Sequence, residues 1–168
     1  MYIQVTGIDP GLDGAIALYD GDYLSVVDIK PYTEAAPNKG RGRVVNWGLL
    51  SYDISPNLSR AEAIFIEQVG SMPGQGVASM FKFGYICGGL RGIVAASSSA
   101  PCYMVTPQKW KKYYELGADK LDAYQVASNL FPEYHDEFFV TPKGRIKDGA
   151  VEAALIAKYG YDILREEQ

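Results

Sequence analysis

The amino-acid sequence predicts an α/β fold in which helices flank a mixed five-stranded sheet. Residues 2–8, 14–19 and 23–30 read as three successive strands joined by short Gly/Asp turns, which is the pattern of an antiparallel meander. The short apolar runs at 63–66 and 102–105 are separated by a long helical segment, as parallel strands are. The length of 168 residues suits one domain with a buried core.

The segments between the third and fourth strands have two different compositions. Residues 31–45 are rich in Pro, Gly and charged side chains, which predicts a flexible loop. Residues 46–58 predict a helix that ends between Asp53 and Pro56, because proline limits its continuation.

A long helix is expected over residues 77–96, after a Gly/Pro loop at 70–76. Gly84, Gly88 and Gly92 recur every four residues and therefore share one face of this helix. Each glycine costs a helix about 1 kcal/mol relative to alanine, so the repeat indicates a packing requirement. Small residues on one face allow a second backbone to approach closely.

Three helices are expected in the last third of the chain, and their start signals are Thr106-Pro107, Asp119 and Asp148. The second should end at Leu130. The third should extend to about Tyr161, with Gly160 near its end, and residues 135–147 should form a loop before it.

The composition excludes several classes of protein. No run of about 18 apolar residues occurs, so no membrane span is expected, and the N-terminus lacks the regions of a signal peptide. Cys87 and Cys102 lie in apolar surroundings, so we expect reduced core residues in a cytoplasmic protein. The single histidine, His135, excludes a zinc cluster of several histidines.

The net charge of −4 argues against a nucleic-acid binder in general, but the basic residues are clustered. The three clusters are Lys39, Arg41 and Arg43; Lys109, Lys111 and Lys112; and Lys143, Arg145 and Lys147. Each cluster alone could be a solvated surface. Together they favour a basic binding face, which an acidic protein can carry.

Two of the predicted strands end in an acid. Asp9 stands before Pro10-Gly11, and Glu67 follows the strand at 63–66. Ligands in α/β sheets bind outside the carboxyl ends of the strands, so both acids are expected at one functional edge. Asp9 alone could instead be a turn residue whose carboxylate bonds the backbone.

The last helix supplies two more acids, Asp148 and Glu152, on one face and about one turn apart. Asp148 could instead simply favour the helix start through the dipole. Carboxylates about 4 Å apart repel by roughly 4 kcal/mol per pair at an effective dielectric of about 20, so such a site needs protons or metal ions. Oxygen ligands suit Mg²⁺ or Mn²⁺, and two such ions form the clamp used in phosphodiester cleavage.

The order of these motifs resembles the RuvC-type Holliday junction resolvases, most closely their short phage-type members. The matching segments are Gly7-Ile8-Asp9-Pro10-Gly11, Gly14-Ala15-Ile16-Ala17, Ile66-Glu67-Gln68-Val69, Thr106-Pro107, Ala118-Asp119-Lys120, and Lys147-Asp148-Gly149 with Glu152-Ala153. The resemblance implies a ribonuclease H-like fold and a homodimer. It also implies cleavage of four-way and other branched DNA by paired nicks, with two Mg²⁺ or Mn²⁺ ions in each active site.

The resemblance implies that Asp9, Glu67, Asp148 and Glu152 are the catalytic metal ligands. The spacing at the last two departs from the family, because Gly149 stands where an acid or histidine is expected, three residues before Glu152.

The residues expected to contact DNA are Lys109, Lys111, Lys112, Lys120, Lys143, Arg145, Lys147 and Gln75. Gln75 belongs to the loop 68–79, where the family contacts the junction centre. The segment 76–96 matches the family's dimer helix, and a buried core helix is the alternative. Asp13 is either a surface turn acid or an outer ligand of the metals.

Three other functions share parts of this pattern. A nuclease for RNA–DNA hybrids would use the same metals. An actin-like ATPase also has an aspartate after its first strand, but usually needs two copies of the fold. A module that bends junctions without cutting them would not need four acids.

Overall fold

The fold is described from a computed structural model, which covers residues 3–36, 42–68, 70, 74 and 76–167. Five strands form the main sheet: β1 (Val5–Asp9), β2 (Ala15–Tyr19), β3 (Leu24–Asp28), β6 (Ala63–Glu67) and β7 (Cys102–Val105). Their order is β3-β2-β1-β6-β7. The first three strands are antiparallel, whereas β6 and β7 run parallel to β1. The predicted mixed five-stranded sheet is confirmed.

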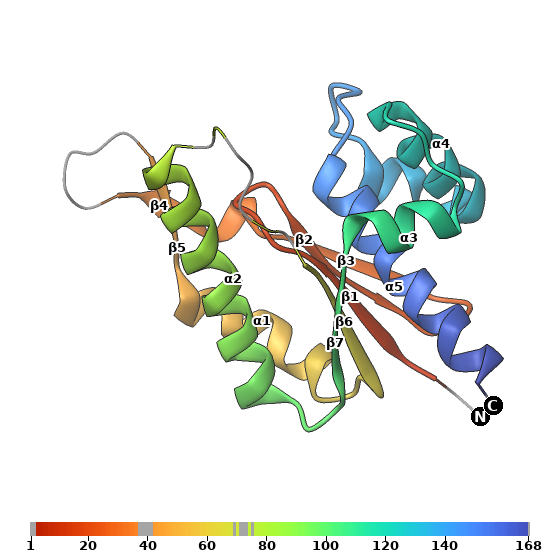
Figure 1. The fold of residues 1–168 in the computed structure, drawn as a ribbon, viewed down its shortest axis with the longest axis horizontal. Helices are drawn as coiled ribbons and strands as arrows, with labels where there is room; N and C mark the ends of the chain where they lie inside the picture. Colours follow the sequence, from red (N-terminus) through yellow and green to blue (C-terminus); the bar gives the residue numbers. More distant parts are fainter. Residues whose placement is uncertain (1–2, 37–41, 69, 71–73, 75, 168) are drawn as a thin grey trace.

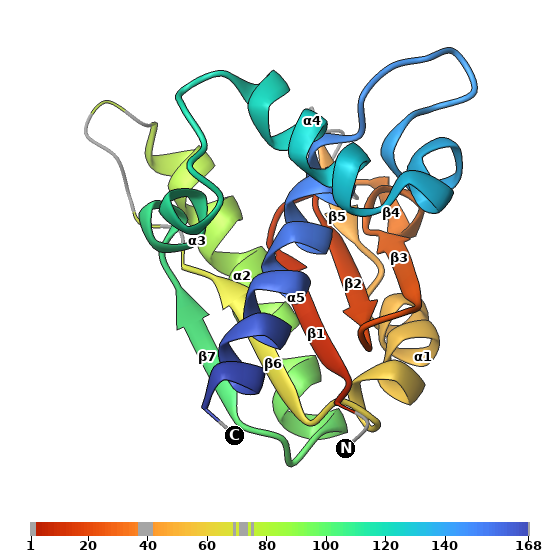
Figure 2. The ribbon, with the colours of Figure 1, turned by 90° about the vertical axis from the view of Figure 1, so that its right-hand side faces the viewer.

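Helices cover both faces of this sheet (Figure 1). They are α1 (Trp47–Leu58), α2 (Val77–Ser97), α3 (Pro107–Tyr113), α4 (Lys120–Leu130) and α5 (Asp148–Glu166). One apolar core packs α1 and α2 against one face, and a second core packs α3, α4 and α5 against the other. Figure 2 shows α5 lying across this face in front of β1 and β6, and the helix also packs against β2.

The alternation of side chains along the strands assigns each residue to one of these cores. Ile8 and Ile66 pack in the core of α1 and α2, whereas Val5 and Phe65 pack in the core of α5. Because successive residues of a strand point to opposite faces, the residue after Ile8 and the residue after Ile66 both point toward α5. These two residues are Asp9 and Glu67.

A glycine lets α5 lie directly against the central strand. A Cβ at Gly7 would overlap the backbone of α5 at Ala153 and Ala157. With glycine at this position, the helix backbone contacts β1, and Glu152, next to Ala153, is carried close to the end of that strand.

The region predicted as a flexible loop, 31–45, contains regular structure. A short 3₁₀ turn (Lys30–Tyr32) leads into a second, two-stranded sheet of β4 (Thr33–Ala35) and β5 (Arg43–Val45). The prediction was wrong for these strands because each has only three residues, and the Gly/Pro-rich composition around them is typical of a loop. Residues 37–41, with Lys39 and Arg41, lie outside the described residues.

Two helices run further than predicted. α1 continues past Pro56 to Leu58, although Pro56 has no N–H to donate to the carbonyl of Tyr52. α5 continues past Gly160, which is buried against the ring of Phe65. This glycine serves close packing and not helix termination.

Residues 135–147 also contain more structure than the predicted loop. A π-helical turn (His135–Phe139) is followed by a bridge between Val140 and Ile146. Cys87 and Cys102 are both free, but their expected place in the core was wrong, because Cys87 is half-buried and Cys102 is exposed on β7, at the edge of the sheet. In the part of the chain that the structure describes, no helix has the length and apolarity to span a membrane.

Candidate metal centre

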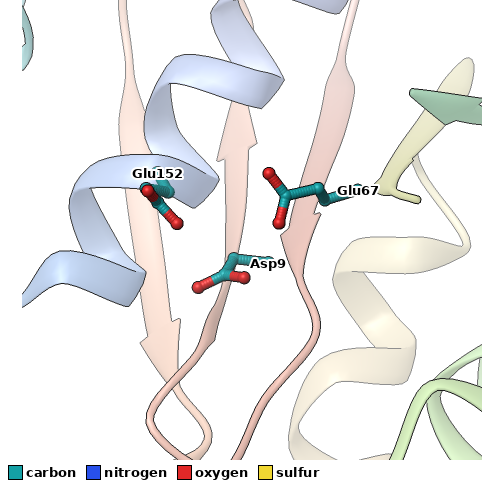
Figure 3. Close-up of side chains that lie close together, drawn as sticks. All are labelled: Asp9, Glu67 and Glu152. Carbon is teal, nitrogen blue, oxygen red and sulfur yellow. The ribbon is translucent and has the colours of Figure 1, made fainter. Parts of the chain in front are cut away.

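Asp9 and Glu67 lie side by side at the carboxyl ends of two paired strands. Ile8 on β1 is level with Ile66 on β6 in the parallel register, so the next residue of each strand is the acid. Both acids are on the face that carries α5, as the alternation requires (Figure 3). The predicted placement of these two acids at one edge of the sheet is confirmed.

Glu152 joins them from the second turn of α5. Asp9, Glu67 and Glu152 each offer a carboxylate oxygen, and these three atoms lie within 4.8 Å of one another. The carboxylate of Asp9 lies between the other two in Figure 3. Two strands and one helix therefore bring three acids to one point.

The surroundings of these acids disfavour their charged forms. Burial raises the pKa of Asp9 well above its usual range, and the charges of Glu152 and Glu67 raise it further. Burial also raises the pKa of Glu67, which is 6% exposed; the Trp110 N–H works in the opposite direction, and Glu152 adds to the rise. A cation among the three carboxylates would relieve both the burial cost and the repulsion.

Two residues of α3 contact this group. The indole Nε1–H of Trp110, which is fully buried, donates a hydrogen bond of 2.9 Å to Oε1 of Glu67. The ammonium of Lys111 lies 3.5 Å from Oε1 of Glu152, and its charge lowers the pKa of Asp9. Lys111, predicted to contact DNA, thus lies beside the acids themselves.

Asp148 is not part of the three-acid group. It begins α5, one turn before Glu152, and its half-exposed side chain accepts a hydrogen bond of 3.2 Å from Nζ of Lys120. Its charge still contributes to the raised pKa of Asp9, so it lies within electrostatic reach of the group. The structure brings three of the four predicted ligands together and places the fourth at the rim.

The donor set fits a hard divalent cation. The three converging side chains offer only carboxylate oxygens, which are the ligands that Mg²⁺ and Mn²⁺ prefer. Two of them have raised pKa values from burial and mutual repulsion, which a bound cation would reverse. Asp9, Glu67 and Glu152 are therefore the residues that could hold such an ion.

The other residues predicted to contact DNA differ in their surroundings. Lys109, Lys112, Lys143 and Arg145 are exposed. Lys147 pairs with Asp28, and both line a hollow of about 470 Å³ that Asp148 and Arg145 also border. Gln75 lies outside the described residues.

Sequence reasoning missed two contacts. The sequence does not indicate that Trp110 bonds an acid of the site, because a tryptophan in a short helix is typical of an ordinary core residue. Arg43 was identified only as part of a basic loop, but its Nη2 donates a hydrogen bond of 2.8 Å to Asp13. Asp13 is an exposed turn acid; partial burial raises its pKa, but the hydrogen bond and charge of Arg43 lower the pKa overall.

Comparison with known proteins identifies the fold. No family model matches the sequence, and no curated protein matches it either. Among solved structures, Thermus thermophilus RuvC superimposes with a TM-score of 0.63 over 98% of this chain and 97% of that one, at 17% sequence identity. The chain has the RuvC fold.

A second structure gives the same result. T. thermophilus RuvC in complex with a Holliday junction substrate matches with a TM-score of 0.60 and 18% identity, over 99% of this chain and 98% of that one. The ribonuclease H-like fold implied by the sequence motifs is thus confirmed along nearly the whole chain. At this level of identity, the likeness to RuvC concerns the fold.

Proposed function

We propose that the protein is a metal-dependent endonuclease of the RuvC type, which cleaves four-way DNA junctions and related branched DNA as a homodimer. The observation that carries the proposal is the convergence of Asp9, Glu67 and Glu152 within 4.8 Å at the carboxyl edge of the sheet. The RuvC fold around that group supports the substrate class, since one matched RuvC structure holds a Holliday junction substrate. A DNA substrate of this kind is consistent with a cytoplasmic protein.

The acids would hold two ions of Mg²⁺ or Mn²⁺, with Asp148 completing the set at the rim. When bound, such ions supply a nucleophilic water at neutral pH and stabilise the leaving oxygen of the phosphodiester. The protein contributes the placement of the ligands: Asp9 and Glu67 from paired strands, and Glu152 from a helix seated on them.

The basic residues near the acids would position the DNA backbone. Lys111 and Lys120 contact Glu152 and Asp148, so their ammonium groups already lie at the mouth of the site. The exposed Lys109, Lys112 and Arg145 extend this basic character outward. Contacts of this type set the register of the substrate without reading its sequence.

The homodimer would form through α2. Val77 and Phe81 are 84% and 77% exposed at its N-terminal end. A Cβ added at Gly84, Gly88 or Gly92 would meet none of the described atoms within 4 Å, so these glycines do not pack within the chain. A second copy of α2 is the partner that this apolar, small-residue face suits, and two active sites are what paired nicks require.

Cleavage of a synthetic four-way junction, with each strand labelled in turn, tests the proposed activity. We expect symmetric nicks in two opposite strands with Mg²⁺ or Mn²⁺, and none in chelator. A linear duplex and an RNA–DNA hybrid of the same sequence are the controls. Preferential cleavage of the hybrid would replace the proposal with a ribonuclease H activity, and junction binding without cleavage would make the protein a binding module.

Sedimentation equilibrium at micromolar concentration tests the dimer. Gly88→Leu places a bulky side chain on the outward face of α2 and should give monomers that no longer make paired nicks. Tyr52→Leu, at an 80% exposed position of α1, is the matched control and should remain dimeric. A monomeric parent protein that still makes paired nicks would contradict the dimer.

A further inference from the structure

Trp110 stands out among the buried side chains because its polar atom bonds a carboxylate of the candidate site. It is fully buried, and its Nε1–H donates to Oε1 of Glu67 at 2.9 Å. A buried indole N–H needs an acceptor, and a buried carboxylate needs a donor or a cation. Each group therefore satisfies the other, although the two residues lie 43 positions apart in the chain.

The ring of the same tryptophan contacts Lys111, which pairs with another acid of the group. The ammonium of Lys111 lies 5.1 Å from the centroid of the Trp110 ring and pairs with Glu152 at 3.5 Å. Trp110 thus touches Glu67 with its N–H edge and Lys111 with its ring. It is held in place by the core between the sheet and α5.

We propose that Trp110 is a positioning residue of the metal centre. Its N–H holds Oε1 of Glu67, which fixes the orientation of the carboxylate that would bind the metal. This inference rests on the proposed metal site and assigns a function to a residue of α3 that does not itself contact the metal or the DNA.

The physical basis is preorganisation of the ligand. A glutamate has several rotatable bonds, and a carboxylate that must be ordered when the cation binds weakens the binding. Hydrogen bonds to ligating carboxylates remove this cost in advance. Loss of such an outer partner typically reduces metal affinity about 10- to 100-fold.

Trp110→Phe tests the inference, because it removes the N–H and keeps an aromatic ring. We expect Mn²⁺ affinity, measured by calorimetry on the intact protein without DNA, to fall about 10- to 100-fold. The Mn²⁺ concentration for half-maximal junction cleavage should rise by a similar factor. Trp47→Phe is the matched control, since Trp47 also donates its Nε1–H, at 2.9 Å, but to the hydroxyl of Tyr85. It should bind Mn²⁺ like the parent.

A second pair of measurements separates positioning from packing. In a Glu67→Ala protein, which has no acceptor for the indole N–H, Trp110→Phe should cause no further loss of Mn²⁺ affinity, whereas a general packing defect would weaken binding in either background. A tryptophan isostere with sulfur in place of Nε1–H fills the same volume. At position 110 it should reproduce the loss of Mn²⁺ affinity, whereas a residue that acts only by filling volume would leave the affinity as in the parent.

The outcomes distinguish this inference from the proposed function. A parent protein that does not bind Mn²⁺, or an Asp9→Asn protein that binds it equally well, would overturn the metal site itself. If the parent binds Mn²⁺ and both the Trp110→Phe and the isostere proteins bind it equally tightly, only the role of Trp110 is overturned. Should the phenylalanine variant fail to fold, the isostere alone decides the question.

Discussion

The candidate site contains two acids borne by strands and two borne by a helix, and the two pairs are positioned by different means. Asp9 and Glu67 follow residues that are level in a parallel ladder, so backbone hydrogen bonds set their separation. Glu152 and Asp148 are placed by the way α5 packs on the sheet, against β1, β2 and β6. The strand pair is fully inside the group, whereas the helix pair is split between the group and the rim.

The difference shows that a strand register and a helix packing fix side-chain positions with different precision. A ladder register can change only in whole residues, and a one-residue shift of either strand would turn its acid to the other face. A helix that packs on a strand places one side chain per turn on the facing side. Successive turns lie at different distances from the end of the strand. Glu152 falls inside the group, and Asp148, one turn earlier, meets Lys120 instead.

The largest expected effect follows from removing a strand acid. Asp9→Asn should lower the rate of junction cleavage about a thousandfold or more, because loss of several kcal/mol of charge stabilisation corresponds to that factor. Junction binding should persist, since the amide keeps the shape and lowers the negative charge. Single-turnover cleavage and a gel-shift titration of the same protein measure the two effects.

Asp13→Asn is the matched control, four residues along the same turn. Asp13 is exposed and pairs with Arg43 and Lys30, and exposed pairs are worth less than about 1 kcal/mol, so cleavage should stay within about fivefold of the parent. Equal cleavage rates for the parent and Asp9→Asn proteins would contradict the proposed metal site at the strand ends.

The helix pair should respond unequally to the same change. Glu152→Gln should reduce cleavage about a hundredfold or more and weaken Mn²⁺ binding, because it removes a ligand from the group. Asp148→Asn should reduce cleavage only about tenfold, since Asp148 lies at the rim. Parallel titrations of cleavage against Mn²⁺ concentration measure both variants. Equal losses would mean that Asp148 leaves Lys120 and enters the site.

The sequence was sufficient to predict the sheet and its strand-borne acids. Apolar runs that end abruptly in Asp9 and Glu67 indicate where the two strands end. Because side chains alternate in strands, they also indicate that the two acids point to the same face of the sheet. The hairpin of β4 and β5 was missed, since each strand has three residues and the turn composition dominates that region. Pro56 predicts a helix end and Gly160 predicts one nearby, but both helices continue, because local propensity does not record what a residue packs against.

The helix-borne part of the site was predicted less completely, for a related reason. Sequence spacing places Asp148 and Glu152 on one face but does not say how far α5 extends over the end of β1. That distance depends on contacts such as the one at Gly7, which join positions about 150 residues apart. The bond from Trp110 to Glu67 depends in the same way on tertiary packing.

A change at the contact between α5 and β1 should displace Glu152 and leave the two strand-borne acids in place. Gly7→Ala puts a Cβ against the α5 backbone, which should lower the free energy of unfolding by about 1–3 kcal/mol. It should also weaken Mn²⁺ binding, because Glu152 moves while Asp9 and Glu67 remain. Urea denaturation in chelator and calorimetry measure the two effects. Gly48→Ala is the control, since the nearest atom to its added Cβ is 3.7 Å away.

The smallest expected effect concerns stability without metal, and its direction follows from the raised pKa values. Folded protein keeps protons on Asp9 and Glu67 that the unfolded chain releases, so in chelator the free energy of unfolding should fall as the pH rises above about 4. Asp9→Asn removes the more strongly shifted group. Its melting temperature at pH 7 in chelator should therefore be a few degrees higher than that of the parent, and should vary less with pH.

Added Mg²⁺ or Mn²⁺ should reverse this ranking. Metal binds the folded site, and the parent should gain about 2.7 kcal/mol when free metal is 100 times its dissociation constant. The Asp9→Asn protein has lost a ligand and should gain less, so the two melting curves should cross as metal is added. If Asp9→Asn instead melts below the parent in chelator and responds equally to metal, Asp9 stabilises the turn at Pro10-Gly11. The carboxylate of Asp9 would then serve the stability of the turn and would not bind a metal.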